Sequence, residues 1–372
     1  MHLLAGILGA LLVLAMLGEF FVSFMLPVRV KRDPRIARGL FELLWRLWRG
    51  VGRRLPESPR ETLLGLFGPL GLLFILTLWT AGLVLGFAAL QYAVGSHVRG
   101  DGARGSVGDD LYFSAGGFLS ASSGVEPTST GAKALLLIEA ATGFGVLFIA
   151  IGYLPALFQA FSRRETAVSQ LDPRAGSPPT AGALIRRAVE REQVDELLSY
   201  LGEWEGWAAE LMETHLSYPV IGYYRSQHLG QNWLAAITAV LDACALIAAA
   251  TPVNTADSAT LTFALARHAV SDLTYTFRAT AATAPDRLAS AQFDELYTLL
   301  EGSGLTIADA PTTRARLDEL RAMYEPQVAA LSSALALSLP AWTGPGKPIA
   351  NWHAAMPERG RAGRAVSPGP LP

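Results

Sequence analysis

The sequence is poor in cysteine and in charge. Its single cysteine, Cys244, excludes an intramolecular disulfide and any metal site built from several thiolates. Only 17% of the 372 residues are charged, and the formal net charge is -2. The mean hydropathy is above zero, which is too apolar for a purely soluble protein. A net charge this close to zero gives no reason to expect a nucleic-acid partner.

Motifs that carry common enzymatic or regulatory chemistry are missing. No GxGxxG sequence follows a strand pattern, and the chain has no Walker lysine, no HExxH and no EF-hand loop. No nucleophile, base and orienting residue stand out as a set. We therefore expect no enzymatic activity, no cofactor and no resident metal ion.

What the sequence does contain is long apolar runs, at residues 3–26, 63–92 and 134–161. A bilayer core requires roughly 20 apolar helical residues, so each run is long enough to span it. The second run has no charged residue, and the third has only Glu139. The first run lacks a basic leading segment and an evident cleavage site, so we expect a retained span instead of a signal peptide.

The loop between the first two runs, residues 28–61, predicts the orientation of the chain. It carries ten Lys or Arg against four Asp or Glu, and short basic loops stay in the cytoplasm. The N-terminus is then outside a cell (inner) membrane, residues 95–130 lie on the outer side, and the C-terminal half is cytoplasmic. Residues 36–54 form an amphipathic pattern with leucines opposite arginines and tryptophans on the flank. This pattern is typical of a helix in the membrane interface that contacts lipid, although an ordinary soluble amphipathic helix would show it too.

Between the second and third runs lies YFSAGGFLSASSGVEPTST, which begins at Tyr112. A short helix through Leu119 and then small polar residues are expected. Irregular chain at membrane depth is tolerated only where protein or a wet cavity surrounds it, and a re-entrant loop meets that condition. The alternative is a surface helix and loop that never enter the membrane.

Residues 63–165 resemble the pore unit of the bacterial two-transmembrane potassium channel family. YFSA matches the start of such pore helices, and IEAATGFGVLFIAIGYLPALFQAF, from Ile138, is similar to an inner helix. The resemblance implies an all-α membrane protein with a potassium-channel-like pore domain, to which this chain adds an N-terminal span and a cytoplasmic α-helical domain. Since one pore unit per chain cannot enclose a pore, it also implies self-association as a homotetramer.

The resemblance fails at the filter, where SASSG replaces the family's TVGYG. The expected filter-like loop consists of Ser120, Ala121, Ser122, Ser123, Gly124 and Glu126. Anchoring on YFSA puts residues 121–124 on Val-Gly-Tyr-Gly, whereas a slip of one residue puts residues 126–127 on the family's Asp-Pro, and both registers stay open. Glycines allow the backbone conformations that aim carbonyls at one axis. Their partial loss predicts a weakly selective pore for monovalent or mixed cations, and the alternative is a non-conducting sensor or scaffold.

Other membrane residues have two interpretations each. Glu126 would form a carboxylate ring in a tetramer, or is a solvated loop charge. An ionisable residue within a span normally has a partner, so we expect Glu139 to bond the short helix or the loop as a support, with ion contact as the alternative. Gly143, Gly145 and Gly152 suit a gating hinge or close helix packing.

In the cytoplasmic half, helical periodicity follows a Pro/Gly-rich stretch. Helices are expected at 183–200, 203–216, 231–250, 258–277, 291–301 and 313–339. Asp242 interrupts the apolar run 234–250, which favours a buried soluble helix over a fourth span. The segments that we expect are an N-terminal span (1–27), an interfacial helix (28–61), an outer span (62–94), an outer loop with pore helix and filter-like loop (95–130), an inner span (131–165), a linker (166–185), a helical domain (186–345) and a disordered tail (346–372).

The densest polar and aromatic stretch of this half is HLSYPVIGYYRSQHLGQNW. His215, Arg225 and His228 from this stretch, with His268 from a later helix, are candidates for an anionic-ligand pocket or a subunit contact. The alternative is an interhelical loop whose side chains satisfy one another. A third class of function, a membrane-tethered ligand-binding or enzymatic domain, rests on the same residues.

Overall fold

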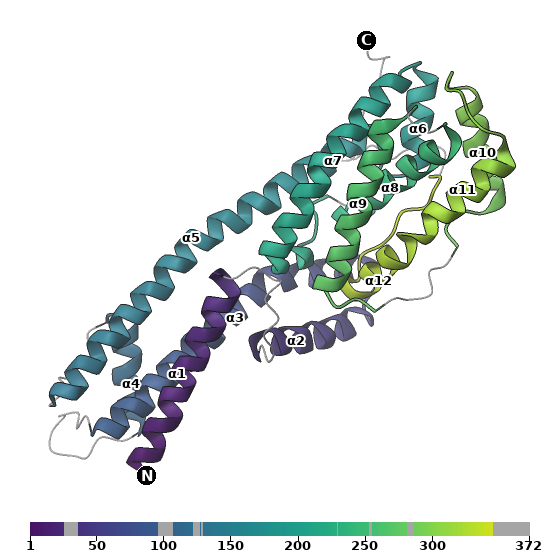
Figure 1. Ribbon diagram of the computed structural model, residues 1–372. Coiled ribbons are helices and arrows are strands. Elements are labelled where there is room, and N and C mark those ends of the chain that lie inside the picture. Colours follow the sequence, from purple (N-terminus) through teal and green to yellow (C-terminus); the bar gives the residue numbers. More distant parts are fainter. Residues whose placement is uncertain are drawn as a thin grey trace, which may run out of the picture. The chain divides into compact units, whose positions relative to one another are not determined.

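The computed structural model describes residues 1–25, 36–95, 107–121, 127, 129–228, 230–252, 255–280 and 286–344, and these form an all-α protein without strands (Figure 1). The helices are α1 (His2–Met25), α2 (Ile36–Gly52), α3 (Glu57–Val94), α4 (Val107–Phe118), α5 (Thr130–Ala175), α6 (Ala181–Glu190), α7 (Val194–Ser217), α8 (Trp233–Ala250), α9 (Asp257–Thr276), α10 (Ser290–Glu301), α11 (Ala310–Ala322) and α12 (Glu325–Leu335), with a 3-10 turn η1 (Pro219–Tyr223).

The chain forms two compact units. Unit 1 consists of Met1–Arg163 and Leu211–Arg225, and unit 2 consists of Arg164–Glu210 and Ser226–Pro372. Helices α5 and α7 each continue from one unit into the other. The chain therefore passes between the units at three points, and residues 211–225 are an excursion from unit 2 into unit 1.

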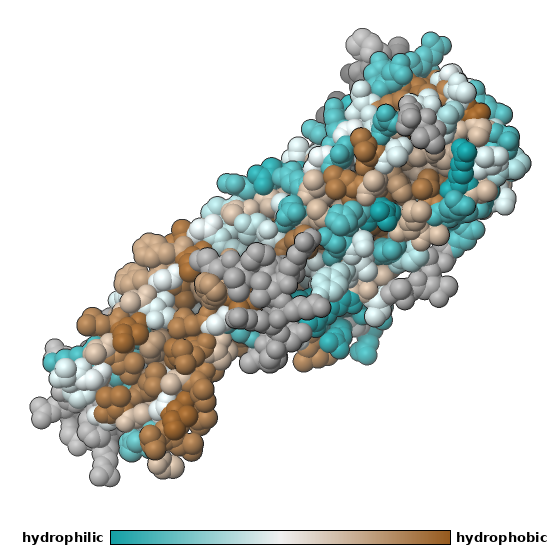
Figure 2. Space-filling view, viewed as in Figure 1, coloured by the Kyte–Doolittle hydropathy of each residue, from teal (hydrophilic) through white to brown (hydrophobic). Residues whose placement is uncertain are grey.

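Four helices are long and apolar enough to span a membrane, namely His2–Phe24, Ser58–Val94, Thr130–Ala175 and Trp233–Ala250. This composition indicates a membrane protein. Apolar side chains gather on the surface over the first three of these helices in Figure 2. The fourth, α8, differs because 94% of its apolar window is buried among other parts of the chain.

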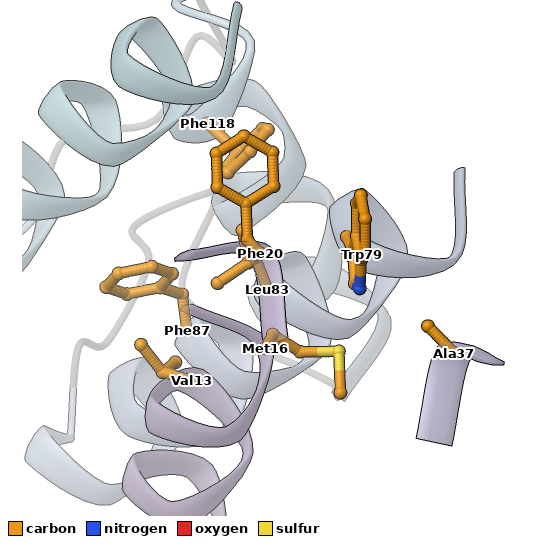
Figure 3. Packing of buried hydrophobic residues seen from close by; sticks show 8 residues of the cluster. All are labelled: Val13, Met16, Phe20, Ala37, Trp79, Leu83, Phe87 and Phe118. Carbon is orange, nitrogen blue, oxygen red and sulfur yellow. The ribbon is translucent and has the colours of Figure 1, made fainter. Parts of the chain in front are cut away.

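Small residues let α1 and α3 pack closely in unit 1. A Cβ on Gly9 would lie 2.7 Å from the carbonyl oxygen of Gly86, and one on Gly82 would lie 2.6 Å from the sulfur of Met16. Close backbone approach of this kind is how helices associate in lipid, where burying apolar surface gives no net gain. Beside this contact lies an apolar cluster that also reaches α2 and α4 (Figure 3), made of Val13, Met16, Phe20, Ala37, Trp79, Leu83, Phe87 and Phe118.

Helix α2 has three distinct faces. Its aromatic face packs on α3 and η1 through Phe41 and Trp45. The leucine face is exposed, and the arginines occupy the third side. The helix starts where the carboxylate of Glu19 in α1 accepts a hydrogen bond from the backbone N–H of Ala37 at 2.9 Å, because the first N–H groups of a helix lack partners within it.

Unit 2 is built around α8, whose residues are nearly all buried. Asn232 caps it, accepting a hydrogen bond from the N–H of Ala235 at 2.7 Å. The unit is a helical assembly as expected, but three boundaries differ from the expected ones.

The interval 166–185, predicted as a linker, is mostly helix. Val168, Leu171 and Ala175 continue the buried face of α5, and the helix stops at Gly176, which has φ +81°. The expected helix pair 183–200 and 203–216 breaks instead at residues 191–193, where Glu192 has φ +55°. The expected helix 313–339 divides at residue 324, because Pro326 favours a new helix start. The predicted disordered tail, residues 346–372, lies outside the described residues.

Candidate functional site

The short helix α4 lies in the chain between the two longest apolar helices, α3 and α5. Asp109 and Asp110 in its first turn suit the positive end of the helix dipole. At its other end, Ala121 N donates to Gly116 O at 2.8 Å and Ser120 N donates to Gly117 O at 3.1 Å. Ser120 has φ +54°. These bonds form a Schellman motif, which ends the helix and turns the chain away from its axis.

A buried polar contact fixes α4 against both neighbours. The hydroxyl of Ser114 lies 2.9 Å from the carbonyl oxygen of Val84 in α3 and also within hydrogen-bonding distance of the carboxyl group of Glu139 in α5. Gln91 of α3 interacts with the same carboxyl group. Ser114, Gln91 and Glu139 are each fully buried. Glu139 therefore lies against the short helix, in contact with the hydroxyl of Ser114.

Glycines bring the backbones of α4 and α5 together next to this contact. A Cβ on Gly143 would lie 2.0 Å from the carbonyl oxygen of Phe118, so only glycine fits there. On the opposing side, a Cβ on Gly117 would lie 2.5 Å from a methyl carbon of Leu136. For Gly143, close packing is thus the role that the geometry supports. The last turn of α4 therefore packs directly against α5.

Of the six residues expected in the filter-like loop, the structure describes the first two. Ser120 and Ala121 are exposed and follow α4 after one residue, Leu119. Ser122, Ser123, Gly124 and Glu126 lie outside the described residues, so their part in an ion pathway stays a prediction.

Gly145 and Gly152 lie on a different side of α5 from Gly143. No atom lies within 4 Å of a Cβ placed on either residue. Phe148 lies one turn from each of them, and it belongs to a row of exposed apolar side chains on the adjoining face of the helix, at the spacing i, i+3, i+4 and i+7. These exposed side chains are Phe144, Leu147, Phe148 and Ile151.

The four candidate residues of the C-terminal half fall into both units. His215 and Arg225 belong to unit 1, whereas His228 and His268 belong to unit 2. His215 is buried, with Nδ1 2.8 Å from Leu211 O. His228 is exposed, and His268 Nε2 is 3.7 Å from a carboxylate oxygen one turn further along α9. No group of three possible metal ligands occurs among the residues that the structure describes.

A buried charged cluster in unit 2 is a feature that sequence reasoning missed. Asp242 of α8 accepts two hydrogen bonds from Arg287, at 2.7 and 3.0 Å, and one from the hydroxyl of Tyr324 at 2.5 Å. Arg287 also contacts Glu325 at 3.1 Å, and Glu325 bonds Arg321 at 3.1 Å. The position of Asp242 inside an apolar run does indicate a buried charge, and a buried charge requires partners. The sequence could not identify those partners, because they lie 45 and 82 residues away along the chain.

These contacts hold the members of the cluster in place. Burial raises the pKa of the Asp242 carboxyl group, and the guanidinium of Arg287 opposes that shift. Burial alone would lower the pKa of Arg287, but the carboxylate of Asp242 outweighs it and raises that pKa. The cluster joins α8 to α12 and to the segment before α10. Removing one member of a buried pair leaves an uncompensated charge and is strongly destabilising. We interpret the cluster as a structural tie.

Comparison with known proteins gives no match among protein-family models, curated proteins or solved structures.

Proposed function

We propose that this chain is one subunit of a potassium-channel-like cation channel with a non-standard filter and weak selectivity, controlled by its cytoplasmic helical domain. The observation that carries the proposal is α4, a short helix between two long apolar helices that is bonded to both through Ser114. A helix held in this way and ending in small polar residues suits a re-entrant pore loop. Its hydroxyls and carbonyls would coordinate partly hydrated cations.

The proposed topology follows the positive-inside rule. Residues 28–61 are cytoplasmic, the N-terminus and the loop after α3 are outside, and unit 2 is in the cytoplasm. Helix α8 belongs to the core of the cytoplasmic domain in this proposal, because 94% of its apolar window is buried.

Helix α2 would lie in the inner interface of the membrane. Leu43, Leu47 and Val51 expose their side chains along one face, while Arg46 and Arg53 lie on another. Apolar residues and arginines on adjoining faces suit acyl chains and anionic headgroups respectively. Membrane lipid is therefore a proposed partner.

The unpartnered face of α5 supports self-association. Phe148 lies one turn from Gly145 and one turn from Gly152, and both glycines leave open space beside them. A bulky ring from one copy fits beside a glycine of another, as in other membrane helix contacts. Four copies are proposed, because a single pore unit contributes only one wall of a pore.

Ion flux from liposomes tests the proposal. The full-length protein is expected to release sodium and potassium at comparable rates and to exclude chloride. A flux restricted to potassium would contradict the weak selectivity. No flux from verified oligomers under any ligand, voltage or pH condition tried would contradict conduction.

A non-conducting sensor or scaffold is the second candidate. It is favoured by the filter-like sequence itself, which lacks the family's tyrosine and one of its glycines. In that case the oligomer forms as proposed but passes no ion.

A further inference from the structure

Residues 218–225, which we name the docking segment, contact three membrane-proximal helices within unit 1. Tyr218 packs edge-on against Tyr153 of α5 at 5.2 Å between ring centroids. Tyr223 packs against Trp45 of α2 at 5.1 Å, and Tyr224 packs against Phe161 of α5 at 5.5 Å. Burial raises the pKa of Tyr223, so its phenol stays neutral within this aromatic cluster.

The contact with α3 is the closest. A Cβ on Gly68 would lie 2.5 Å and 2.8 Å from two ring carbons of Tyr224, so the ring occupies space that only glycine leaves open. One turn earlier, the Cβ position of Gly65 is 3.6 Å from the side chain of Arg225. Arg225 Nε also lies 4.0 Å from a carboxylate oxygen of Glu61.

This stretch of α3 contains a proline between two glycines. Pro69 lies inside it and removes the backbone hydrogen bond to Gly65. Sharp bends in helices occur at proline and at glycine pairs, and Gly68 and Gly71 flank the proline. The docking segment therefore packs on α3 where the helix lacks one backbone hydrogen bond and where bending is favoured.

The docking segment is tied to unit 2 on both sides. Helix α7 runs into it without a break from unit 2. After it, the chain returns to unit 2 and is fixed where Gln231 donates to the hydroxyl of Ser177 at 3.2 Å and Asn232 donates to Ser338 O at 3.1 Å. A shift of α7 or α8 would act on the docking segment through these short connections.

We propose that the docking segment transmits the state of the cytoplasmic helical unit to α3, by holding the glycine and proline stretch at residues 65–71 in one conformation. This transmission rests on the proposed function only in its last step, in which a conformational change in α3 alters ion conduction. The contact and the transmission to α3 do not depend on any ion being conducted.

The first experiment measures how readily trypsin cleaves after Arg225 in the full-length protein in lipid nanodiscs. Gly68→Ala places a methyl group against the ring of Tyr224, whereas Gly65→Ala, one turn away, places one at ordinary contact distance from Arg225. We expect cleavage about tenfold faster in Gly68→Ala, because cleavage follows the population of the released segment, and within about twofold of wild type in Gly65→Ala. Equal rates in the two variants would overturn the proposal.

A double-mutant cycle covers the case in which Gly68→Ala impairs folding. Tyr224→Leu removes the ring, so adding Gly68→Ala to it should change the cleavage rate little. An undiminished effect of Gly68→Ala in that background would mean that the ring is not what the glycine accommodates, and would overturn the proposal.

The second experiment tests transmission by hydrogen exchange. Tyr324→Phe removes a hydrogen bond from the buried cluster of unit 2. We expect faster exchange at the docking segment and at residues 65–72 of α3, with α1 unchanged as a control. Faster exchange in the docking segment without any change in α3 would overturn the proposal. Transmission to α3 without ion flux in any variant would contradict the proposed function alone.

Discussion

Replacing Gly143 with alanine should separate α4 from α5, while the same change at Gly145 should be tolerated. The Cβ of an alanine at position 143 would lie 2.0 Å from the carbonyl oxygen and 2.9 Å from the carbonyl carbon of Phe118. These are backbone atoms of the short helix, so no side-chain rotation relieves the clash. At Gly145 no atom lies within 4 Å of the added carbon.

The two substitutions form a matched pair. Alanine gains about 1 kcal/mol over glycine inside a helix, and this gain is common to both positions and cancels in their difference. Overpacking a tight contact costs about 1–3 kcal/mol. Gly143→Ala should therefore be about 1–3 kcal/mol less stable than Gly145→Ala, which is roughly 5- to 150-fold in the unfolding equilibrium.

Unfolding in nanodiscs, followed by tryptophan fluorescence, measures this difference, because Trp79 lies in the apolar cluster that includes Phe118. In the proposed channel, conduction should be affected in parallel, since α4 leads into the filter-like loop. Equal stability of the two variants, or a larger loss at Gly145, would refute the close approach of α4 to α5.

Three further predictions concern single side chains. Ser114→Ala should destabilise unit 1 by about 1–3 kcal/mol, because the buried carboxyl group of Glu139 loses its hydroxyl partner; a neutral result in the same unfolding assay would contradict this role. Ser120→Gly should stabilise the end of α4 by about 1 kcal/mol, since the serine has φ +54°, and a loss of stability would argue against the Schellman motif. The hydrogen bond from Arg321 lowers the pKa of Asp286, so the pair contributes stability above about pH 4 that is lost as the pH falls. Because the side chain of Asp286 is 65% exposed, this contribution to stability is under about 1 kcal/mol. Asp286→Asn should flatten the acid side of a plot of stability against pH. An unchanged plot would count against the ion pair.

The helical class and the three long apolar helices of unit 1 could be predicted from the sequence, because both depend on local pattern. Runs of apolar residues and the 3.6-residue period determine which segments are helical. That Glu139 has a partner in the short helix or the loop could also be anticipated, since an ionisable group within an apolar helix requires one, but the sequence did not single out Ser114.

The contacts of the docking segment could not be predicted in this way. Tyr224 and Gly68 are far apart in the sequence, and no local period links them. The sequence does show three glycines spaced three residues apart around Pro69. Such glycines indicate that another group packs closely against the helix, but they do not indicate which group it is. The continuation of α5 to Ala175 was missed for another reason. Proline and glycine near its end suggested a linker, but the apolar face of the helix outweighs them.

The central claim is that several copies of this chain surround one pore. Single-particle images of the full-length protein in nanodiscs test it most directly. The account predicts four copies around a common axis, with the end of α4 and residues 120–121 of each copy directed toward that axis. Particles with fewer than four copies, or without a central axis, would contradict it.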